Sequence, residues 1–399
     1  MSDDTVEWPE FLKPRLRLFF GVDLVGSTSF KQKSKYPLKS PSDKNFGDLG
    51  ASWFSEIANF YRSVEEHFKI AWDDCCISYA RVLNKKLNCS PSLWKSNGDE
   101  LIYSISLNEP DDVGYVLTAW LKALKAYRTE LKERNQDLDI KGAAWIAGFP
   151  IDNAEVIFCK EISKQVERYR DEDPKVFHFE LLEKWYHNDD EDNREGLVKD
   201  YVGPAIDTGF RVSTQATPRK FVLSLETALM LSGVTLRREF YDDFGVSRNI
   251  LKMAFDGLKT FKGVLGGKPY PLFWIDFLHE DDELTKAFIK LSQTDYPNKD
   301  DILDYCEQFI TDNSSQFFYP FIYEHNGNRF NQIPPNYIAT LDRLTERWVA
   351  EKDRLDIRWQ SMKEDISKAP PSNGNDDVVD VAQDITVPLV VDSKDASEG

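Results

Sequence analysis

The chain has 399 residues, of which 41% are hydrophobic and 13% aromatic, and its formal net charge is −18 at pH 7. It can therefore bury a sizeable core, while its acidity argues against nucleic acid or an anionic membrane as a partner. No run approaches the roughly 20 apolar residues of a membrane span, and the first residues lack signal-peptide features. The five cysteines have no zinc-like spacing. We therefore expect a cytoplasmic protein with reduced thiols.

The first predicted strand ends in a carboxylate. Apolar residues alternate over 16–22, which predicts a strand, and Asp23 stands where the apolar run stops. The small residues Gly26, Ser27 and Thr28 follow, and their backbone N–H groups can bind a phosphate. A carboxylate beside a phosphate indicates a cation between them.

A second carboxylate stands in a similar setting. Residues 94–104 predict a hairpin, because Asn97-Gly98 is a strong two-residue turn signal. Asp99 leaves that turn at the root of the second strand. Two antiparallel strands, one ending in Asp23 and one starting at Asp99, can bring both carboxylates to one end of a sheet. That arrangement is typical of a two-metal site for phosphoryl or nucleotidyl transfer.

The other predicted elements mix strands and helices without a strict βαβ rhythm, which favours an α+β fold with helices on one face of the sheet. In chain order we expect a polar loop (31–50), helices (51–70 and 111–135), a strand of small residues approached closely by a ligand or partner (142–149), an irregular insertion (151–196), a strand and helix (220–224 and 225–231), a hairpin (260–277) and helices near 282–293, 300–312 and 335–365. The expected domains are an N-terminal segment (1–15), a main domain (16–279), a helical extension (280–369) and a disordered acidic tail (370–399).

Four motifs in the chain resemble those of the class III nucleotidyl cyclases, in the same order. They are the Gly-Ser-Thr turn after the first strand, the Gly-Asp turn of the hairpin, the string DYVGPAIDTGFR and the tripeptide FKG. The resemblance implies an antiparallel sheet of the ferredoxin-like or palm type. It also implies that Asp23, Asp99 and the backbone carbonyl of Leu24 bind two divalent metal ions, Mn²⁺ or Mg²⁺.

The same resemblance implies roles for residues of the other motifs. Lys95 and Asp200 match the positions that read the base, Arg211 and Asp207 match the catalytic helix, and Lys262 matches the lysine that contacts the triphosphate. It further implies a homodimer in which each active site lies across the two-fold interface. The first-strand face that carries Phe19 and Gly21 needs covering, which favours such a partner.

The chain departs from the family at one position and is ambiguous at two others. Asp207 stands where most class III cyclases have Asn, and a carboxylate near a phosphate is unfavourable unless it is protonated or paired with Arg211. Lys95 and Asp200, taken literally, match enzymes that read adenine. Base identity is therefore open at this point.

A closer resemblance is to the pyrimidine cyclases of bacterial Pycsar anti-phage systems. It rests on the strings WPEFLKPRLRLFFGVDLVGST, ANFYRSVEEHF, LWKSNGDELIY and DYVGPAIDTGFR. It implies a homodimer that turns UTP or CTP into a 3′,5′-cyclic monophosphate, and a separate effector protein that binds the product. Three readings stay open: a pyrimidine cyclase, a purine cyclase or cyclic-dinucleotide synthase of related fold, and a degenerate cyclase that only binds nucleotide.

Overall fold

The structure is a computed structural model that describes residues 7–33, 46–47, 50–159, 173–187, 196–277, 287, 290–291, 296–317, 319–327 and 329–368. The chain divides into two compact units, residues 1–348 and 349–399. In the described part of the second unit there is only the later portion of helix α11 (Tyr337–Lys368). None of the described helices combines the length and apolar character that crossing a membrane requires.

Seven strands form the main sheet of the first unit. They are β1 (Arg15–Val25), β4 (Ser92–Asn97), β5 (Glu100–Leu107), β6 (Asp139–Phe149), β9 (Lys220–Leu223), β10 (Met253–Lys259) and β11 (Tyr270–Asp276). Their order is β10-β11-β9-β6-β1-β5-β4, and only the β6–β9 pair is parallel. Two small sheets pair β2 (Phe46–Gly47) with β3 (Gly50–Ala51) and β7 (Ala154–Cys159) with β8 (Leu197–Val202). This confirms the expected α+β fold with a mainly antiparallel sheet.

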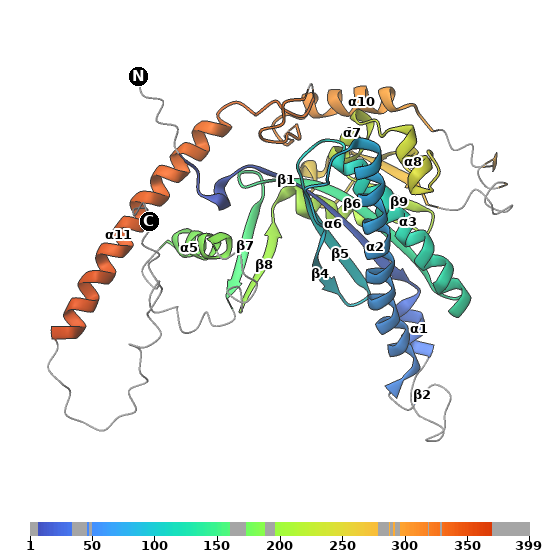
Figure 1. Cartoon of the computed structure of the whole chain (residues 1–399), viewed down its shortest axis with the longest axis horizontal. Helices are drawn as coiled ribbons and strands as arrows, with labels where there is room; N and C mark the ends of the chain where they lie inside the picture. Colours follow the sequence, from blue (N-terminus) through green and yellow to red (C-terminus); the bar gives the residue numbers. More distant parts are fainter. Residues whose placement is uncertain are drawn as a thin grey trace, which may run out of the picture. The chain divides into compact units, whose positions relative to one another are not determined.

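The two longest helices of the first unit cover one face of the main sheet (Figure 1). They are α2 (Ser52–Leu83) and α3 (Asp112–Arg134). Phe20 of β1 packs against Phe68 of α2 and Trp120 of α3, with ring centroids 5.6 and 5.1 Å apart. Apolar residues at intervals of three and four on these helices are buried, among them Ile57, Phe60 and Val64 of α2.

The other helices in the described part of the first unit are shorter. They are α1 (Ser27–Lys33), α5 (Pro174–His187), α6 (Pro204–Ser213), α7 (Leu225–Gly233), α8 (Arg238–Phe244) and α10 (Lys299–Asp312), with 3₁₀ turns η1 (Glu10–Leu12) and η3 (Leu265–Gly267). Helix α6 lies on the face of the sheet opposite α2 and α3. A Cβ atom at Gly209 of α6 would overlap the indole of Trp145 on β6, so only glycine permits this close approach.

The chain itself covers the sheet face that the sequence left for a partner. Phe19 is fully buried, its ring stacked on Trp145 and edge-on to Trp94 and Tyr201. The expectation that this face needs a second chain is therefore wrong. The small residues of β6 are likewise explained within the chain, because a Cβ at Gly142 would lie 2.7 Å from the ring of Phe221.

Three other expectations need correction. The first long helix runs to residue 83 instead of 70, and the expected irregular insertion contains strand β7 and helix α5. The hairpin around Gly266 has its first strand at 253–259, before the predicted start. The predicted tail at 370–399, nearly all of the predicted helix at 282–293 and most of the loop at 31–50 lie outside the described residues.

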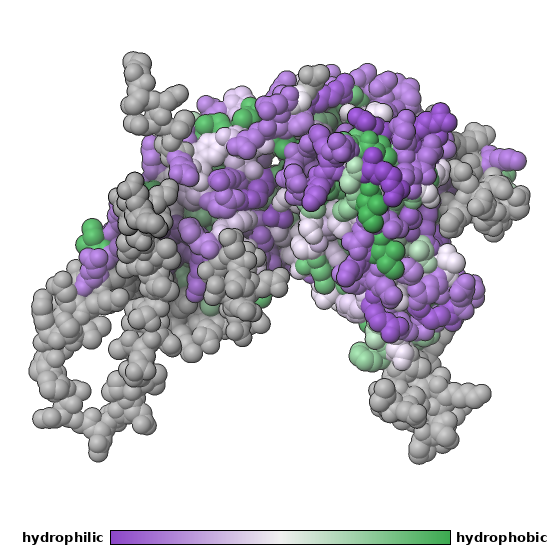
Figure 2. Space-filling model, viewed as in Figure 1, coloured by the Kyte–Doolittle hydropathy of each residue, from purple (hydrophilic) through white to green (hydrophobic). Residues whose placement is uncertain are grey.

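The surface seen in Figure 2 is mainly hydrophilic, in keeping with the charge of the chain. Hydrophobic side chains gather along α2, whose exposed apolar residues are Phe54, Ile70 and Ile77. These three side chains are spread over about six turns of the helix. The buried residues on the opposite side of α2 account for its packing on the sheet.

Candidate active site

The end of β1 is joined to the β4–β5 turn by a backbone hydrogen bond. The N–H of Leu24 donates to the carbonyl oxygen of Asp99 at 3.0 Å, and Asp23 stands opposite Glu100 in the antiparallel register. The carboxylates of Asp23 and Asp99 are therefore held at one end of the sheet, as the sequence predicts. Both side chains keep partial solvent access, with exposed fractions of 30% and 27%.

Charged side chains lie close to both carboxylates. Lys141 Nζ lies 3.0 Å from Asp23 Oδ2, and Lys31 Nζ lies 3.8 Å from Asp99 Oδ2. Burial and the nearby Asp23 raise the pKa of Glu100. Several carboxylates thus lie at this corner of the sheet, and two lysines from different elements, β6 and α1, lie beside them.

The turn after β1 redirects the backbone and also supplies a hydrogen bond to one of the carboxylates. Gly26 adopts a positive φ of 89°, and a Cβ there would lie 3.0 Å from the carbonyl oxygen of Asp137. The buried hydroxyl of Ser27 donates to Oδ2 of Asp99, whereas Thr28 is exposed. Ser27 thus orients one of the two carboxylates, a role that the sequence did not suggest.

This corner fits a hard divalent cation by the chemistry of its donors. Mg²⁺ and Mn²⁺ favour carboxylate and carbonyl oxygens, and Mg²⁺ commonly takes one or two carboxylates together with substrate phosphates. Asp23, Asp99 and the carbonyl of Leu24 are donors of that kind. Among the described residues no group of three or more His, Cys, Asp or Glu side chains is arranged to hold a metal. Two carboxylates and one carbonyl are fewer than the six oxygens that Mg²⁺ takes, and water or phosphate oxygens can supply the others.

A second group of predicted residues lines a cavity of about 680 Å³. Asp207 and Arg211 come from successive turns of α6, and Lys262 comes from the loop between β10 and β11. All three side chains are exposed. No ion pair joins Asp207 to Arg211, although both residues are described. Two cations and one carboxylate therefore line the same cavity, and a phosphate chain bound there would be attracted by Arg211 and Lys262 and repelled by Asp207.

Lys95 and Asp200 are brought into direct contact. Lys95 Nζ donates to both carboxylate oxygens of Asp200 at 3.0 and 3.1 Å, and Trp94 Nε1 donates to Oδ1 at 2.9 Å. The β4–β5 register shifts between Leu93 and Lys95, a bulge that allows consecutive side chains to reach one carboxylate. Burial opposes ionisation, yet the Lys95 bond holds the pKa of Asp200 below its ordinary value.

The predicted metal-binding carboxylates, Asp23 and Asp99, and the cavity lie at different ends of β1. Arg15 and Leu16 line the cavity, whereas Asp23 lies eight residues beyond Arg15, about 26 Å along an extended strand. Neither Asp23 nor Asp99 belongs to the cavity lining. One chain therefore does not bring all the predicted residues to a common site.

Some residues of the cavity and the carboxylate corner were not predicted from the sequence. Residues 315–317 and 319–321, which the sequence assigned to a helical extension, include Phe317 and Tyr319 of the cavity wall, and Tyr337 lines it too. Asp152 also lines the cavity, and burial raises its pKa to about 7. No local pattern marks these positions, because their role depends on contacts between distant segments.

The comparisons with known proteins returned only remote similarity. No known family profile matches the chain, and no curated protein matches it. Among solved structures it is similar to the adenylyl cyclase CyaB from P. aeruginosa, with 10% identity, a TM-score of 0.37, and coverage of 68% of this chain and 98% of that one.

Two further solved structures give similar values. The guanylyl cyclase Cya2 has 11% identity, a TM-score of 0.33, and coverage of 68% of this chain and 96% of that one. The guanylate cyclase domain of RhGC from Catenaria anguillulae, in complex with GTP, has 9% identity, a TM-score of 0.32, and coverage of 66% and 97%. Scores of this size carry no functional conclusion, so the function must be inferred from the residues of the chain.

Proposed function

We propose that this chain is a class III nucleotidyl cyclase that converts UTP, or in second place CTP, into a 3′,5′-cyclic monophosphate and pyrophosphate. The observation that carries the proposal is that one fold presents two groups of residues, each of which could bind only part of a metal–nucleotide complex. One end of β1 offers Asp23 and Asp99 as cation ligands, and the cavity at the other end offers Arg211 and Lys262 as phosphate ligands. Each group supplies what the other lacks.

The reaction needs these groups together. The ribose 3′-oxygen attacks the α-phosphorus, the bond to the bridging oxygen of the β-phosphate breaks, pyrophosphate leaves, and the 3′-hydroxyl proton passes to water. Divalent metal ions bound by Asp23, Asp99 and the Leu24 carbonyl would supply a lower pKa for the 3′-hydroxyl and charge neutralisation for the phosphates. Arg211 would stabilise the charge that grows on the α-phosphate, and Lys262 would bind the terminal phosphates.

A homodimer would unite the two groups. In a two-fold arrangement the same patch of each chain meets its copy, so the carboxylates of one chain can face Arg211 and Lys262 of the other. Two equivalent sites would result. The separation of the groups along β1 supports this arrangement.

The base preference rests on the resemblance to the Pycsar pyrimidine cyclases. Following that resemblance, the product would be a second messenger in anti-phage defence that a separate effector protein binds. The chain would act without nucleic acid or membrane as a partner, and would reside in the cytoplasm.

A purine cyclase is the second candidate, and one observation favours it. The Lys95–Asp200 contact at 3.0 Å joins the two positions that would read adenine. A lysine donor and a carboxylate acceptor can bind complementary groups on a base edge. If this pair reads the base directly, ATP would be the substrate.

Incubating the full chain with each of the four nucleoside triphosphates and Mn²⁺, then identifying the products by mass, tests the proposal. We expect cyclic UMP to dominate, with cyclic CMP next. Mainly cyclic AMP or cyclic GMP would replace the pyrimidine assignment with the purine one. A linear or cyclic dinucleotide, or no product from any nucleotide under conditions where the protein binds it, would contradict the cyclase itself.

A further inference from the structure

The strand that carries Asp200 stands outside the main sheet. Within the described residues β8 pairs with β7 alone, whereas Lys95 belongs to β4 at the edge of the seven-stranded sheet. No backbone ladder therefore fixes the distance between Asp200 and Lys95. Whatever holds the β7–β8 pair on the main sheet also sets that distance.

One anchor of this pair is apolar. The ring of Tyr201, next to Asp200 on β8, lies with its centroid 5.0 Å from Phe19, 5.3 Å from Trp94 and 5.3 Å from Phe149. Aromatic contacts of this kind bury the ring of Tyr201 and orient it, but they contribute no ionic link between β8 and β1.

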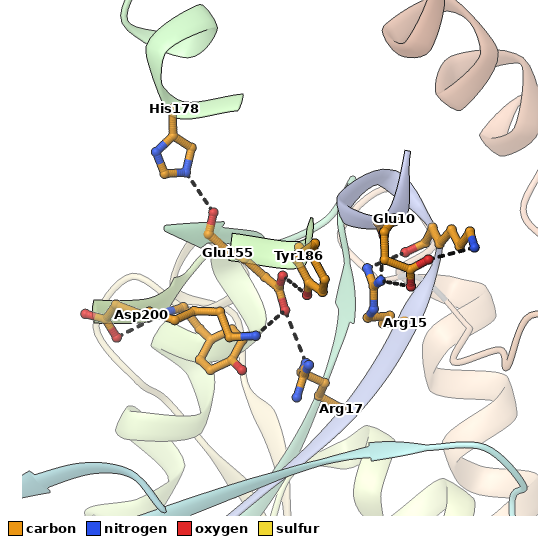
Figure 3. Close-up of polar contacts among 10 residues, drawn as sticks. Glu10, Arg15, Arg17, Glu155, His178, Tyr186 and Asp200 are labelled. Carbon is orange, nitrogen blue, oxygen red and sulfur yellow. Dashed lines mark hydrogen bonds and ion pairs between the residues drawn. The ribbon is translucent and has the colours of Figure 1, made fainter. Parts of the chain in front are cut away.

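Beside the hydrogen bond from Trp94 to Asp200 itself, a further anchor is a buried carboxylate, shown in Figure 3. Glu155 of β7 stands opposite Tyr201 in the register and is 5% exposed. Its Oε1 lies 3.3 Å from Nε of Arg17 on β1 and 3.6 Å from Nζ of Lys199 on β8. The hydroxyl of Tyr186 on α5 donates to its Oε2. One side chain thus contacts the main sheet, β8 and α5 together.

The charge balance makes this carboxylate difficult to replace. Burial alone would raise the pKa of Glu155, but Lys199, Arg17 and the Tyr186 hydroxyl hold it below its ordinary value. Glu155 is therefore ionised and faces two cations, one on each side of the junction. Without its charge Arg17 and Lys199 would repel each other across the gap between β1 and β8.

We propose that Glu155 is a positioning residue, which fixes β8 on the main sheet and thereby sets the contact of Asp200 with Lys95. Lys199 immediately precedes Asp200, so a shift of Lys199 away from Arg17 moves Asp200 as well. A part for that contact in nucleotide recognition rests on the proposed cyclase function, in its pyrimidine or its purine form, whereas the mechanical coupling does not. Neutral Glu155 would thus loosen base recognition while leaving Asp23 and Asp99 in place.

The test compares Glu155→Gln with Asp112→Asn in the full chain. Asp112 is the matched control, because it is also a buried carboxylate, 4% exposed, but accepts backbone N–H groups of Asn108 and Glu109 at the start of α3. For Glu155→Gln we expect KM to rise about tenfold or more, because buried Arg17 and Lys199 would lose their shared counter-ion. We expect kcat to change far less, and the preference between nucleotides to fall.

Hydrogen exchange gives a readout that does not need activity. The amides of 197–202 should exchange faster in Glu155→Gln than in the wild type, and Asp112→Asn should leave them unchanged. If the wild-type chain cyclises no nucleotide but this exchange pattern is found, the proposed function fails and the positioning role stands. Cyclase activity with unchanged KM, nucleotide preference and β8 exchange in folded Glu155→Gln would overturn the positioning role alone.

Two variants keep the test decisive if Glu155→Gln does not fold. Glu155→Asp keeps the charge on a shorter side chain, and its KM should lie between those of the wild type and the neutral variant. Adding Lys199→Met to Glu155→Gln removes one of the two cations, so folding and KM should partly recover. Failure of both variants to move KM or β8 exchange in these directions would overturn the proposal.

Discussion

The backbone N–H of Leu24 donates to the carbonyl oxygen of Asp99 at 3.0 Å, and this bond ties the end of β1 to the β4–β5 turn. It places the two predicted cation ligands, Asp23 and Asp99, on segments that cannot move independently. A hard cation held by such a corner would meet ligands that are already oriented, which lowers the cost of binding.

Replacing either carboxylate should abolish turnover while preserving the fold. Asp23→Asn and Asp99→Asn remove the negative charge without changing shape, so we expect activity to fall by at least about 10²-fold, a loss typical of electrostatic catalytic groups. Asp256→Asn is the matched control, because Asp256 is 28% exposed and ion-paired with a lysine, yet lies on β10. Circular dichroism checks folding. Near-normal activity in either folded variant would remove the metal-binding role.

Arg211→Ala should act mainly on kcat. Its guanidinium lines the cavity and would stabilise charge that develops on the α-phosphate, so we expect kcat to fall by about 10²–10³-fold. Lys262→Ala should instead raise KM, because the terminal phosphates are bound in both ground state and transition state. Steady-state kinetics of the two variants separate these roles. A raised KM with unchanged kcat in Arg211→Ala would show that Arg211 only binds substrate.

Gly142→Ala tests the close packing of β6. A Cβ at this position would lie 2.7 Å from the carbonyl oxygen of Gly21 and 2.7 Å from the ring of Phe221. Overpacking of a core typically costs about 1–3 kcal/mol, and we expect a loss of that order in denaturant titration. Gly148→Ala, on the same strand with nothing nearer than 3.6 Å, is the control and should be nearly neutral. Equal stability of the two variants would contradict the packing described here.

Asp152 should make stability depend on pH. Burial raises its pKa from 3.8 to about 7, so between those values the folded state binds more protons than the unfolded one, and stability falls as pH rises. Asp152→Asn should therefore stabilise the protein at pH 8 by roughly 2 kcal/mol, less than the whole pKa difference implies because the side chain keeps some solvent contact. It should have little effect near pH 4. Thermal unfolding between pH 4 and pH 8 measures this, and a parallel profile in both proteins would contradict it.

Local patterns were sufficient to predict some parts of this fold and not others. The stripe of Phe60, Val64 and Phe68 marks the buried face of α2 because helical periodicity is a local property. The dipeptide Asn97-Gly98 likewise predicted the turn that places Asp99.

Long-range contacts decided the rest. Strand β7 and helix α5 were missed because Glu155 gains its counter-ions from β1 and β8, far apart in sequence. The cover over Phe19 was missed for the same reason, since Trp145 and Tyr201 come from other elements. In the candidate site, the Lys95–Asp200 contact is made beside a bulge at Trp94, and no local sequence pattern predicts that bulge.

The proposed sharing of each active site by two chains is tested most directly by combining two inactive variants in one dimer. Asp23→Ala and Arg211→Ala should each be inactive as homodimers, because every site then carries one lesion. In a verified mixed dimer one site carries both lesions and the other carries none. Purified mixed dimers should therefore regain about half the activity of the wild-type dimer. Mixed dimers that stay inactive, while each variant folds and dimerises normally, would contradict the shared site.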